Sequence, residues 1–419
     1  MRHPWSEGSL EQGLFEEISA IETIDCHEHL PDEHQRVAQA ADVFTLFSHY
    51  TCGDLVAAGM PQAEADSLQN RSLPLDLRWQ KFEPYWRFIR HSSYARAALL
   101  AAERFYGEAD VHGGNYAELS RAVAAANRPG LYRRVLKEAC GLKVSLAQRS
   151  FPEADREYFV PVVDLPFFNQ FFRDDFTWRP LVRPRFCPDG VINSLDEYLA
   201  AGFAFMDEAK GKGAVGFKTI VRDNRPPDRR AALEAFRQLQ RGEAERLPAR
   251  NPLTDYLHDE FTAHAGRLGL PVAVHAGYWG DFRQLNPQHL IPVLQRHPGV
   301  RFDVYHLGFP WWRETLMMAK TFPNMWLNLC WTHIISQRFT QRAIAEALET
   351  VPLGKVSAFG GDYGTPVEKV YGHLVMARED LAVALGEAIR AGRLTADRAS
   401  NIATMWLYEN PKELYGLRD

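Results

Sequence analysis

The sequence is poor in the features that would place the protein outside the cell. Its five cysteines are few for 419 residues, lie far apart and never form a Cys-x-x-Cys pair. Such an odd, scattered set fits neither a disulfide framework nor a zinc ribbon, so we expect a reducing compartment. Residues 1–22 carry several glutamates and no apolar core, and we therefore expect no secretory signal peptide there.

Long apolar runs and an excess of positive charge are also missing. No stretch approaches the roughly 18 uninterrupted apolar residues of a membrane-spanning helix. The net charge is −5, which argues against a nucleic-acid or an anionic membrane surface as the main partner. A small-molecule ligand is the simpler expectation, and we predict a cytoplasmic protein with no nucleic-acid or membrane partner.

What the sequence does contain is a repeated alternation of short apolar stretches with helix-length segments. Eight such stretches occur, for example Leu270-Pro-Val-Ala-Val-His275. This rhythm predicts an α/β fold, the parallel (β/α)8 or TIM barrel, in which helices alternate with the strands they cover. No flexible linker divides the chain, so we predict one domain over residues 1–419. The predicted strands are residues 18–26, 142–147, 158–164, 214–220, 270–275, 300–306, 324–329 and 355–360.

A large helical insertion is predicted after the first strand, over about residues 31–130. It is rich in alanine, arginine and aromatic residues at helical spacing, for example Trp79, Phe82 and Trp86. Its length of about a hundred residues exceeds that of an ordinary loop and indicates a subdomain or a lid. The alternative is a structural cap or the contact surface of a homo-oligomer.

Polar residues that can carry chemistry fall near the ends of the predicted strands. His27 and His29 lie two positions apart at the end of the first strand, and the alternation of side chains along a strand puts both imidazoles on one side. In a TIM barrel the carboxyl ends of all strands meet at one rim, where chemistry is built. Four further residues are expected at this rim, namely Lys218, His275, His306 and Asp362.

These side chains together predict a metal site. Imidazoles with a carboxylate and no thiolate suit a catalytic Zn²⁺ ion, or else Mn²⁺ or Fe²⁺. A metal with an open position lowers the pKa of a bound water to about 7 and supplies hydroxide at neutral pH. Asp362 is expected to ligate the metal and to relay the proton to the leaving group. Taken singly, each histidine would be a core residue and Asp362 a turn residue, but their order along the strands favours the metal site.

In this order the motif resembles the amidohydrolase superfamily of metal-dependent barrels. The match runs from the His-x-His of the first strand to Asp362 after the eighth. The resemblance implies that His27, His29 and Asp362 hold one divalent ion. It also implies that His275 and His306 hold a second ion or, in one-metal members, divide between ligation and polarising the substrate.

Lys218 and the insertion leave the branch of the superfamily open. In two-metal relatives a lysine on the fourth strand is carboxylated by carbon dioxide and bridges the ions, whereas one-metal relatives keep a lysine without a bridge. Both readings apply to Lys218, which would have to be uncharged to be carboxylated. The insertion and the segment His306-Leu-Gly-Phe-Pro-Trp-Trp-Arg-Glu314 are also similar, more loosely, to uronate isomerase and to nodulin-like amidohydrolase domains.

Aromatic and basic residues near the rim are candidates for substrate contacts. Trp279 and Trp311 follow the fifth and sixth strands and would wall a pocket, or else pack the insertion onto the barrel. Arg185 and Arg222 would pair with a substrate carboxylate, although a solvated surface role is the alternative for each. His333, just past the seventh strand, is a further candidate.

The function that these residues favour is that of a metal-dependent hydrolase. Activated water would attack an amide, lactone or related carbonyl of a small, acidic substrate, with Asp362, His275 and His306 as the catalytic residues. A decarboxylase or a uronate-isomerase-like sugar-acid isomerase would use the same site, with Asp362 or His333 moving the proton. A metal-poor barrel acting as a binding module is the third alternative, which the intact set of ligands disfavours.

Overall fold

A barrel of parallel strands lies at the centre of the molecule. The computed structural model describes residues 3–166, 176–177, 192–223, 225–243, 246–248 and 250–418. The barrel strands are β1 (Thr23–Glu28), β2 (Leu142–Arg149), β3 (Phe159–Asp164), β5 (Gly216–Ile220), β7 (Val272–His275), β8 (Phe302–Val304), β9 (Met325–Asn328) and β10 (Val356–Ser357). They form one eight-stranded sheet in this order, and each neighbouring pair is parallel.

Backbone hydrogen bonds close the barrel between its first strand and the segment after its last. The Cys26 N–H donates to the Phe359 carbonyl (3.0 Å), and the Asp362 N–H donates to the His27 carbonyl (2.8 Å). The predicted TIM barrel is confirmed, and each predicted strand has its counterpart in the sheet. Closure also ties the loop that carries Asp362 directly to the strand that carries the histidine pair.

The first strand begins later than predicted, because residues 18 and 19 belong to helix α1 (Leu10–Ser19). Ser9 caps this helix by accepting a hydrogen bond from the Gln12 N–H. Leu14 and Ile18 lie four positions apart and form its buried stripe. The apolar residue at position 18 therefore completes a helix, and β1 starts only at Thr23.

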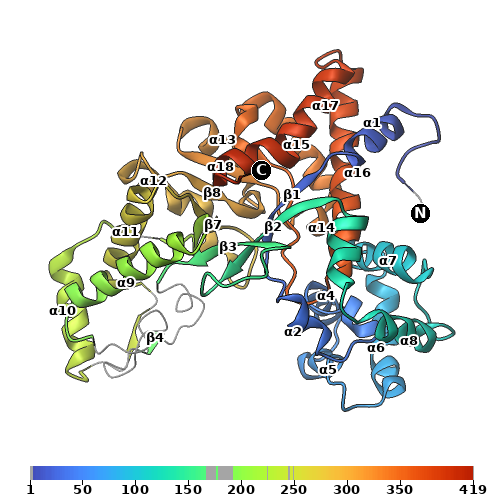
Figure 1. Cartoon of the computed structure of the whole chain (residues 1–419), viewed down its shortest axis with the longest axis horizontal. Coiled ribbons are helices and arrows are strands. Elements are labelled where there is room, and N and C mark those ends of the chain that lie inside the picture. The colour runs from blue at the N-terminus through green and yellow to red at the C-terminus, as the bar shows by residue number, and fades with distance from the viewer. Residues whose placement is uncertain are drawn as a thin grey trace.

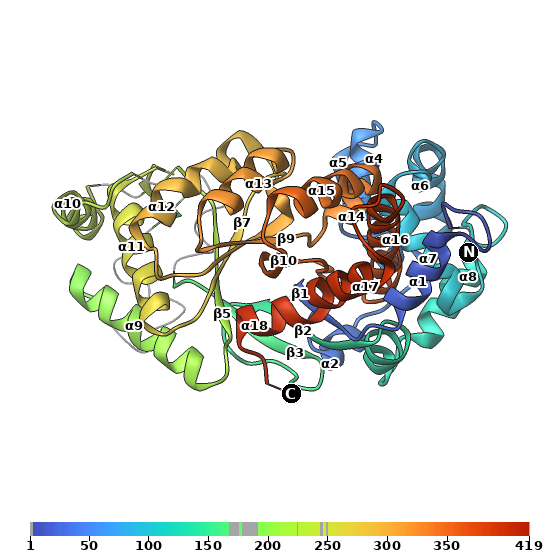
Figure 2. The same ribbon diagram turned by 90° about the horizontal axis from the view of Figure 1, so that it is seen from above.

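Helices surround the strands, as the view from above shows (Figure 2). A separate antiparallel pair joins β4 (Phe176–Thr177) to β6 (Arg246–Leu247). Among the described helices, none combines the length and the apolar character that crossing a bilayer requires. The helices after β3 are α9 (Leu195–Gly211), α10 (Arg229–Gln240), α11 (Pro252–Arg267), α12 (Ile291–Arg296), α13 (Trp312–Thr321), α14 (Thr332–Ile335), α15 (Gln337–Thr350), α16 (Glu368–Arg390), α17 (Ala396–Thr404) and α18 (Asn410–Tyr415).

The insertion is a group of helices packed beside the barrel (Figure 1). It has a hydrophobic cluster of its own, which includes Phe44, Phe47, Phe82 and Trp86. The insertion therefore buries apolar surface within itself as well as against the barrel. Its helices are α2 (Glu33–Val37), α3 (Val43–Leu46), α4 (Tyr50–Ala57), α5 (Gln62–Ser67), α6 (Leu75–Ile89), α7 (Ser93–Tyr106) and α8 (Tyr116–Ala126), and a π-helical segment, Arg133–Ala139, leads into β2.

Helix α7 of the insertion packs closely against α16, the long helix that follows the last strand. The close approach requires glycine at position 372, because a Cβ there would lie 2.0 Å from the Ala97 carbonyl oxygen. We expect Gly372→Ala to lower the free energy of unfolding by about 1–3 kcal/mol, since the two helices must move apart. Chemical denaturation would measure the change.

Gly53→Ala is the matched control for this substitution. A Cβ at Gly53, an exposed position within α4, would meet nothing within 4 Å. This variant should keep its stability or gain up to about 1 kcal/mol, because alanine has the higher helix propensity. Equal losses in the two variants would contradict close packing as the role of Gly372.

Candidate metal centre and active site

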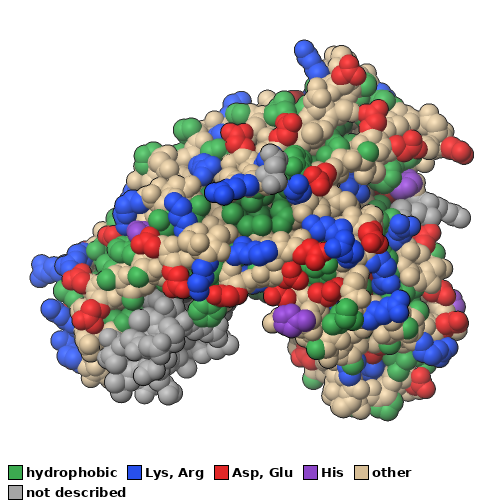
Figure 3. Space-filling view, in the orientation of Figure 1, with side chains coloured by type: hydrophobic (Ala, Val, Ile, Leu, Met, Phe, Trp, Pro, Cys, Tyr) green, Lys and Arg blue, Asp and Glu red, His purple; other side chains and the backbone are tan. Residues whose placement is uncertain are grey.

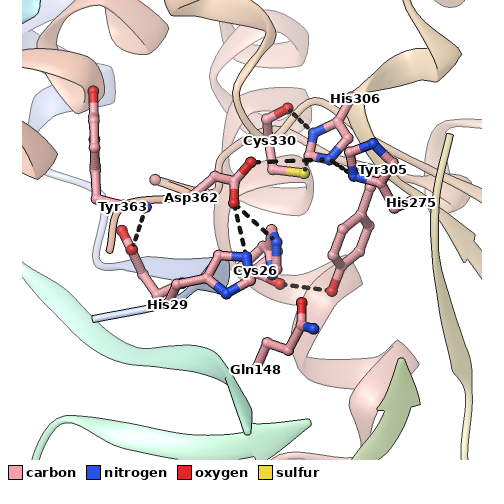
Figure 4. Close-up of polar contacts among 12 residues, drawn as sticks. Cys26, His29, Gln148, His275, Tyr305, His306, Cys330, Asp362 and Tyr363 are labelled. Atoms are coloured by element: carbon pink, nitrogen blue, oxygen red, sulfur yellow. Dashed lines mark hydrogen bonds and ion pairs between the residues drawn. The ribbon is translucent and has the colours of Figure 1, made fainter. Parts of the chain in front are cut away.

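Two imidazoles and a carboxylate meet at the carboxyl end of the barrel. The Nε2 atoms of His27 and His29 each lie 3.1 Å from Oδ1 of Asp362. One ligand atom from each of these residues lies within 4.8 Å of the others, and Figure 4 shows the Asp362 carboxylate turned toward His29. His27 and Asp362 are buried, but the His29 side chain is 39% exposed, so the cluster is open to small molecules.

Carboxyl groups of β1 hold the loop that carries Asp362. Asp25 Oδ1 accepts a hydrogen bond from the Gly361 N–H (3.1 Å), and Glu28 Oε2 accepts one from the Tyr363 N–H (2.8 Å). Glycine at position 361 leaves room for the Glu28 carboxyl group, because a Cβ there would lie 1.8 Å from Glu28 Oε1. Asp362 itself has a left-handed φ of 59°, a strained conformation that the surrounding bonds maintain. The local sequence thus aims one carboxylate at the histidine pair.

His306 and His275 form a hydrogen-bonded chain beside this cluster. His306 follows the end of β8 by two residues, in a turn with a φ of 60°, whereas the sequence predicted it within the strand. Its Nδ1–H donates to the Cys330 carbonyl (3.1 Å), which leaves Nε2 to accept from the His275 Nδ1–H (3.0 Å). The Nε2 of His275 therefore keeps its lone pair.

Burial sets the protonation states of these groups. It lowers the pKa of His27 and of His275 well below the usual value, and that of His306 to about 4. Burial raises the pKa of Asp362, but the adjacent His27 and His29 outweigh it and hold that pKa well below its usual range. Neutral imidazoles and an ionised carboxylate are the forms that bind metal ions.

Lys218 lies within β5 and faces the same cavity. Its Nζ lies 3.7 Å from the centre of the Tyr305 ring and has no hydrogen-bond partner among the described residues. Burial lowers the pKa of Lys218 to about 8, so part of the amine population is neutral near physiological pH. Carboxylation of Lys218, which needs a neutral amine, stays a prediction.

The side chains of His27, His29, Asp362 and His275 fit a divalent metal ion. Imidazole nitrogens with a carboxylate oxygen are a donor set that suits Zn²⁺, Mn²⁺ and Fe²⁺. The buried Nε2 of His275 lines the cavity and has no hydrogen-bond partner within the described part of the chain. The Nε2–H groups of His27 and His29 face the Asp362 carboxylate, and a cation would take the place of their protons.

A cavity of about 500 Å³ opens above the cluster. This volume is within the range of small-molecule pockets. The insertion supplies part of its wall through His49 and Tyr50, and the Tyr50 hydroxyl donates to the Asp362 carbonyl (2.8 Å). The insertion therefore contributes side chains to the cavity, which its helical periodicity alone did not predict.

Another wall comes from the ends of β2 and β3, which hold none of the predicted site residues. Gln148, Arg149 and Ser150 line the cavity from β2 and the residue after it. Asp164 ends β3, accepts a hydrogen bond from the Gln148 amide (2.7 Å), and has its pKa raised to about 7 by burial. Their rim position was the signal that could have found them, since every barrel strand ends at the same face.

Only some of the residues predicted to contact the substrate lie at this cavity. Trp279 lines it. Trp311 is not among the lining residues, and neither is Arg222, which pairs with Asp255 of α11 (3.2 Å). Arg185 lies outside the described residues. The acidic partner of Arg222 comes from a neighbouring helix, which no local sequence pattern around position 222 reveals.

His333 does not line the cavity, contrary to its prediction as a substrate contact. It is fully buried, with Nδ1 2.8 Å from the Asp380 carboxylate and Nε2 2.9 Å from the Ala358 carbonyl. Both ring nitrogens are thus engaged in the core. Helix α14, which begins immediately after Trp331, turns the ring toward α16 instead of toward the barrel mouth.

A closed parallel barrel with one histidine on its first strand, a second histidine directly after that strand and an aspartate after its last strand has the fold of the metal-dependent barrel enzymes. The family model described as Amidohydrolase matches residues 192–417, and the chain belongs to this family. A curated relative, Protein fluG of Emericella nidulans, is 25% identical over 232 residues, which make up 51% of this chain and 27% of fluG. The chain thus spans only about a quarter of that relative.

Solved structures with the same fold cover almost the whole chain. Uronate isomerase from Thermotoga maritima matches with a TM-score of 0.79 and 16% identity over 97% of each chain. Glucuronate isomerase from Caulobacter crescentus gives 0.79 and 15% over 100% of this chain and 96% of its own. A protein of Lactobacillus casei described as a metal-dependent hydrolase gives 0.66 and 18% over 97% and 99%. These likenesses include the insertion, and they show a shared fold.

Proposed function

We propose that the protein is a metal-dependent hydrolase acting on an amide, lactone or related carbonyl of a small, acidic substrate. The observation that carries the proposal is the convergence of His27, His29 and Asp362 on a cavity of about 500 Å³. Membership of the Amidohydrolase family supports it. The positive side chain of Arg149 in the cavity wall favours an anionic substrate.

In this proposal the residues at the barrel mouth hold a divalent ion, most simply zinc. His27, His29 and Asp362 would be its ligands, and His275, held by His306, would complete the site or orient the attacking water through its Nε2 lone pair. When bound there, such an ion supplies Lewis-acid activation of water and of a carbonyl oxygen. The carbon dioxide adduct of Lys218 is a further candidate ligand for a second ion.

Asp362 would move the proton during hydrolysis. Its Oδ1 faces the histidine pair, while Oδ2 lies 3.9 Å from His306 Nε2. The carboxylate would accept a proton from the attacking water and return it to the leaving group. The His275 Nε2 lone pair would accept a hydrogen bond and orient that water, while Tyr50 and Trp279 would restrict bulk solvent.

A sugar-acid isomerase is the second candidate. It is favoured by the fold likeness to uronate isomerases, which extends over nearly the full length of both chains. An isomerase would use Asp362 to move a proton between two carbons, and the basic residues in the cavity wall would bind the sugar acid. A decarboxylase would need the same anion-binding wall.

Turnover in ¹⁸O-labelled water separates these reactions. The test would use zinc-loaded protein with a panel of N-acyl amino acids and sugar-acid lactones, and with D-glucuronate. Hydrolysis should place one solvent oxygen in the product acid, detected by mass spectrometry. Isomerisation of D-glucuronate, with deuterium incorporated at carbon in a parallel reaction in D₂O, and no turnover of any acyl or lactone substrate, would contradict the hydrolase proposal in favour of the isomerase.

A further inference from the structure

A second cavity, of about 890 Å³, lies at the opposite end of the barrel from the metal cluster. Its lining includes Ile24, Val144 and Val160, which stand near the starts of β1, β2 and β3, and Val215, which immediately precedes β5. In a parallel barrel these positions belong to the amino-terminal face, where no part of the proposed chemistry is located. We call this cavity the basal hollow.

Lysine and arginine side chains ring the basal hollow. Figure 3 shows blue side chains around a green floor near the middle of this face. The chain as a whole carries a net charge of −5, so the cluster is a local reversal of sign. Among the described residues that line the hollow, Glu157 alone is acidic, and it is already paired with Arg133. The basic lining residues are Lys143, Arg156, Lys210, Arg301, Lys412 and Arg418.

Several of these basic side chains donate hydrogen bonds to backbone carbonyl groups, which carry no charge to neutralise them. Lys210 Nζ donates to the Leu268 carbonyl (2.8 Å), and Arg301 donates to the Gly269 carbonyl (2.8 Å). Arg156 donates to backbone carbonyls as well, among them that of Pro152 (3.0 Å). A carbonyl fixes the head group but leaves its full positive charge, so the potential of the hollow stays positive.

The floor of the hollow is apolar and rigid. Tyr415 is buried there, and its hydroxyl donates to the Asp303 carboxylate (2.7 Å) in the barrel interior, which holds the ring in place. Val144, Val215 and Leu417 extend the apolar surface beside it. A site with an apolar floor and a cationic rim suits a ligand that has both an organic part and a compact multiple charge.

We propose that the basal hollow binds a small organic phosphate, with the lysine and arginine side chains around the phosphate and the apolar floor beneath the organic part. Phosphate groups match the site because they carry up to two charges and several acceptor oxygens, which planar guanidinium groups bind in pairs. The cations encircle a concave site and do not form an extended stripe, so a small ligand fits better than a nucleic-acid strand.

Calorimetric titration with ADP and with inorganic pyrophosphate tests this proposal on the zinc-loaded full chain. Lys143→Gln with Arg418→Gln is the informative variant, because both side chains are exposed and removing them breaks none of the backbone contacts described above. We expect one ADP per chain, bound more tightly than pyrophosphate, and binding weakened at least about tenfold in the double variant. Adenosine, which has no phosphate, should not bind.

Two controls locate the site. Arg128→Gln with Lys320→Gln removes the same charge from exposed positions outside the hollow and should leave the ADP affinity unchanged. Asp362→Asn alters the barrel mouth and should also leave it unchanged. Loss of ADP binding in Asp362→Asn but not in the hollow variant would move the ligand to the mouth and overturn the proposal.

Three other results would also overturn it. One is the absence of ADP binding at millimolar concentration in the unaltered protein. Another is equal binding of citrate, which would make the hollow a general anion site and not a phosphate site. The third is tighter binding of a single-stranded oligonucleotide than of ADP, which would make this face a nucleic-acid surface.

Discussion

Replacing His27 by alanine is expected to remove the bound metal and the activity together. His27 is buried, and its Nε2 lies 3.1 Å from Asp362 Oδ1. Loss of a direct ligand should weaken zinc binding by more than about a hundredfold, since loss of a partner that merely orients a ligand already costs up to that factor. Turnover should then fall by more than about a thousandfold. Zinc titration and steady-state kinetics measure the two effects.

His112→Ala is the matched control, because this histidine is exposed in the insertion and does not line the cavity. It should keep both zinc affinity and turnover. Circular dichroism must show that His27→Ala remains folded, which is expected because the barrel-closing bonds of this segment are made by the backbone. Full zinc affinity in folded His27→Ala would show that His27 is not a ligand and that other residues bind the ion.

Asp362→Asn should abolish turnover while it leaves the fold intact. Asparagine keeps the shape of the side chain and tolerates the left-handed backbone conformation that position 362 adopts. The hydrogen bond from the Tyr50 hydroxyl goes to the main-chain carbonyl of residue 362 and survives the change. The carboxylate that accepts the proton is lost, so kcat should fall by at least about a thousandfold.

Asp196→Asn makes the same chemical change at an exposed ion pair with Arg229. Asp196 does not line the cavity. It should leave kcat unaltered. The melting temperature of Asp362→Asn should stay close to that of the unaltered protein. A variant at position 362 with near-normal kcat would remove Asp362 from the proton-transfer role, whatever its effect on metal binding.

The barrel and the meeting of His27, His29 and Asp362 could be predicted because both follow from short-range patterns. His27 lies in β1 and His29 directly follows it, two positions further on, so the alternation of side chains puts both on one side. The eight apolar stretches fix the strands, and parallel strands in a barrel end at one face. Position along each strand was therefore enough to bring Asp362 to the histidine pair across more than three hundred residues.

The rest of the cavity depends on contacts that the sequence does not encode locally. Helical spacing in the insertion shows which face of each helix is buried, but not that Tyr50 reaches the Asp362 carbonyl. His333 has the right rim position, yet Asp380 of α16 holds its ring in the core. In both cases the two bonded residues lie on elements that are distant in the sequence, and only tertiary packing brings these elements together.

Anomalous X-ray scattering at the zinc edge, from crystals of the zinc-loaded protein, would show where the ion is bound. We expect a peak at bonding distance from His27, His29 and Asp362, with occupancy lost in crystals of His27→Ala. A metal-replete crystal with no peak among these three side chains, or with its only peak elsewhere on the chain, would show that they do not form the metal site.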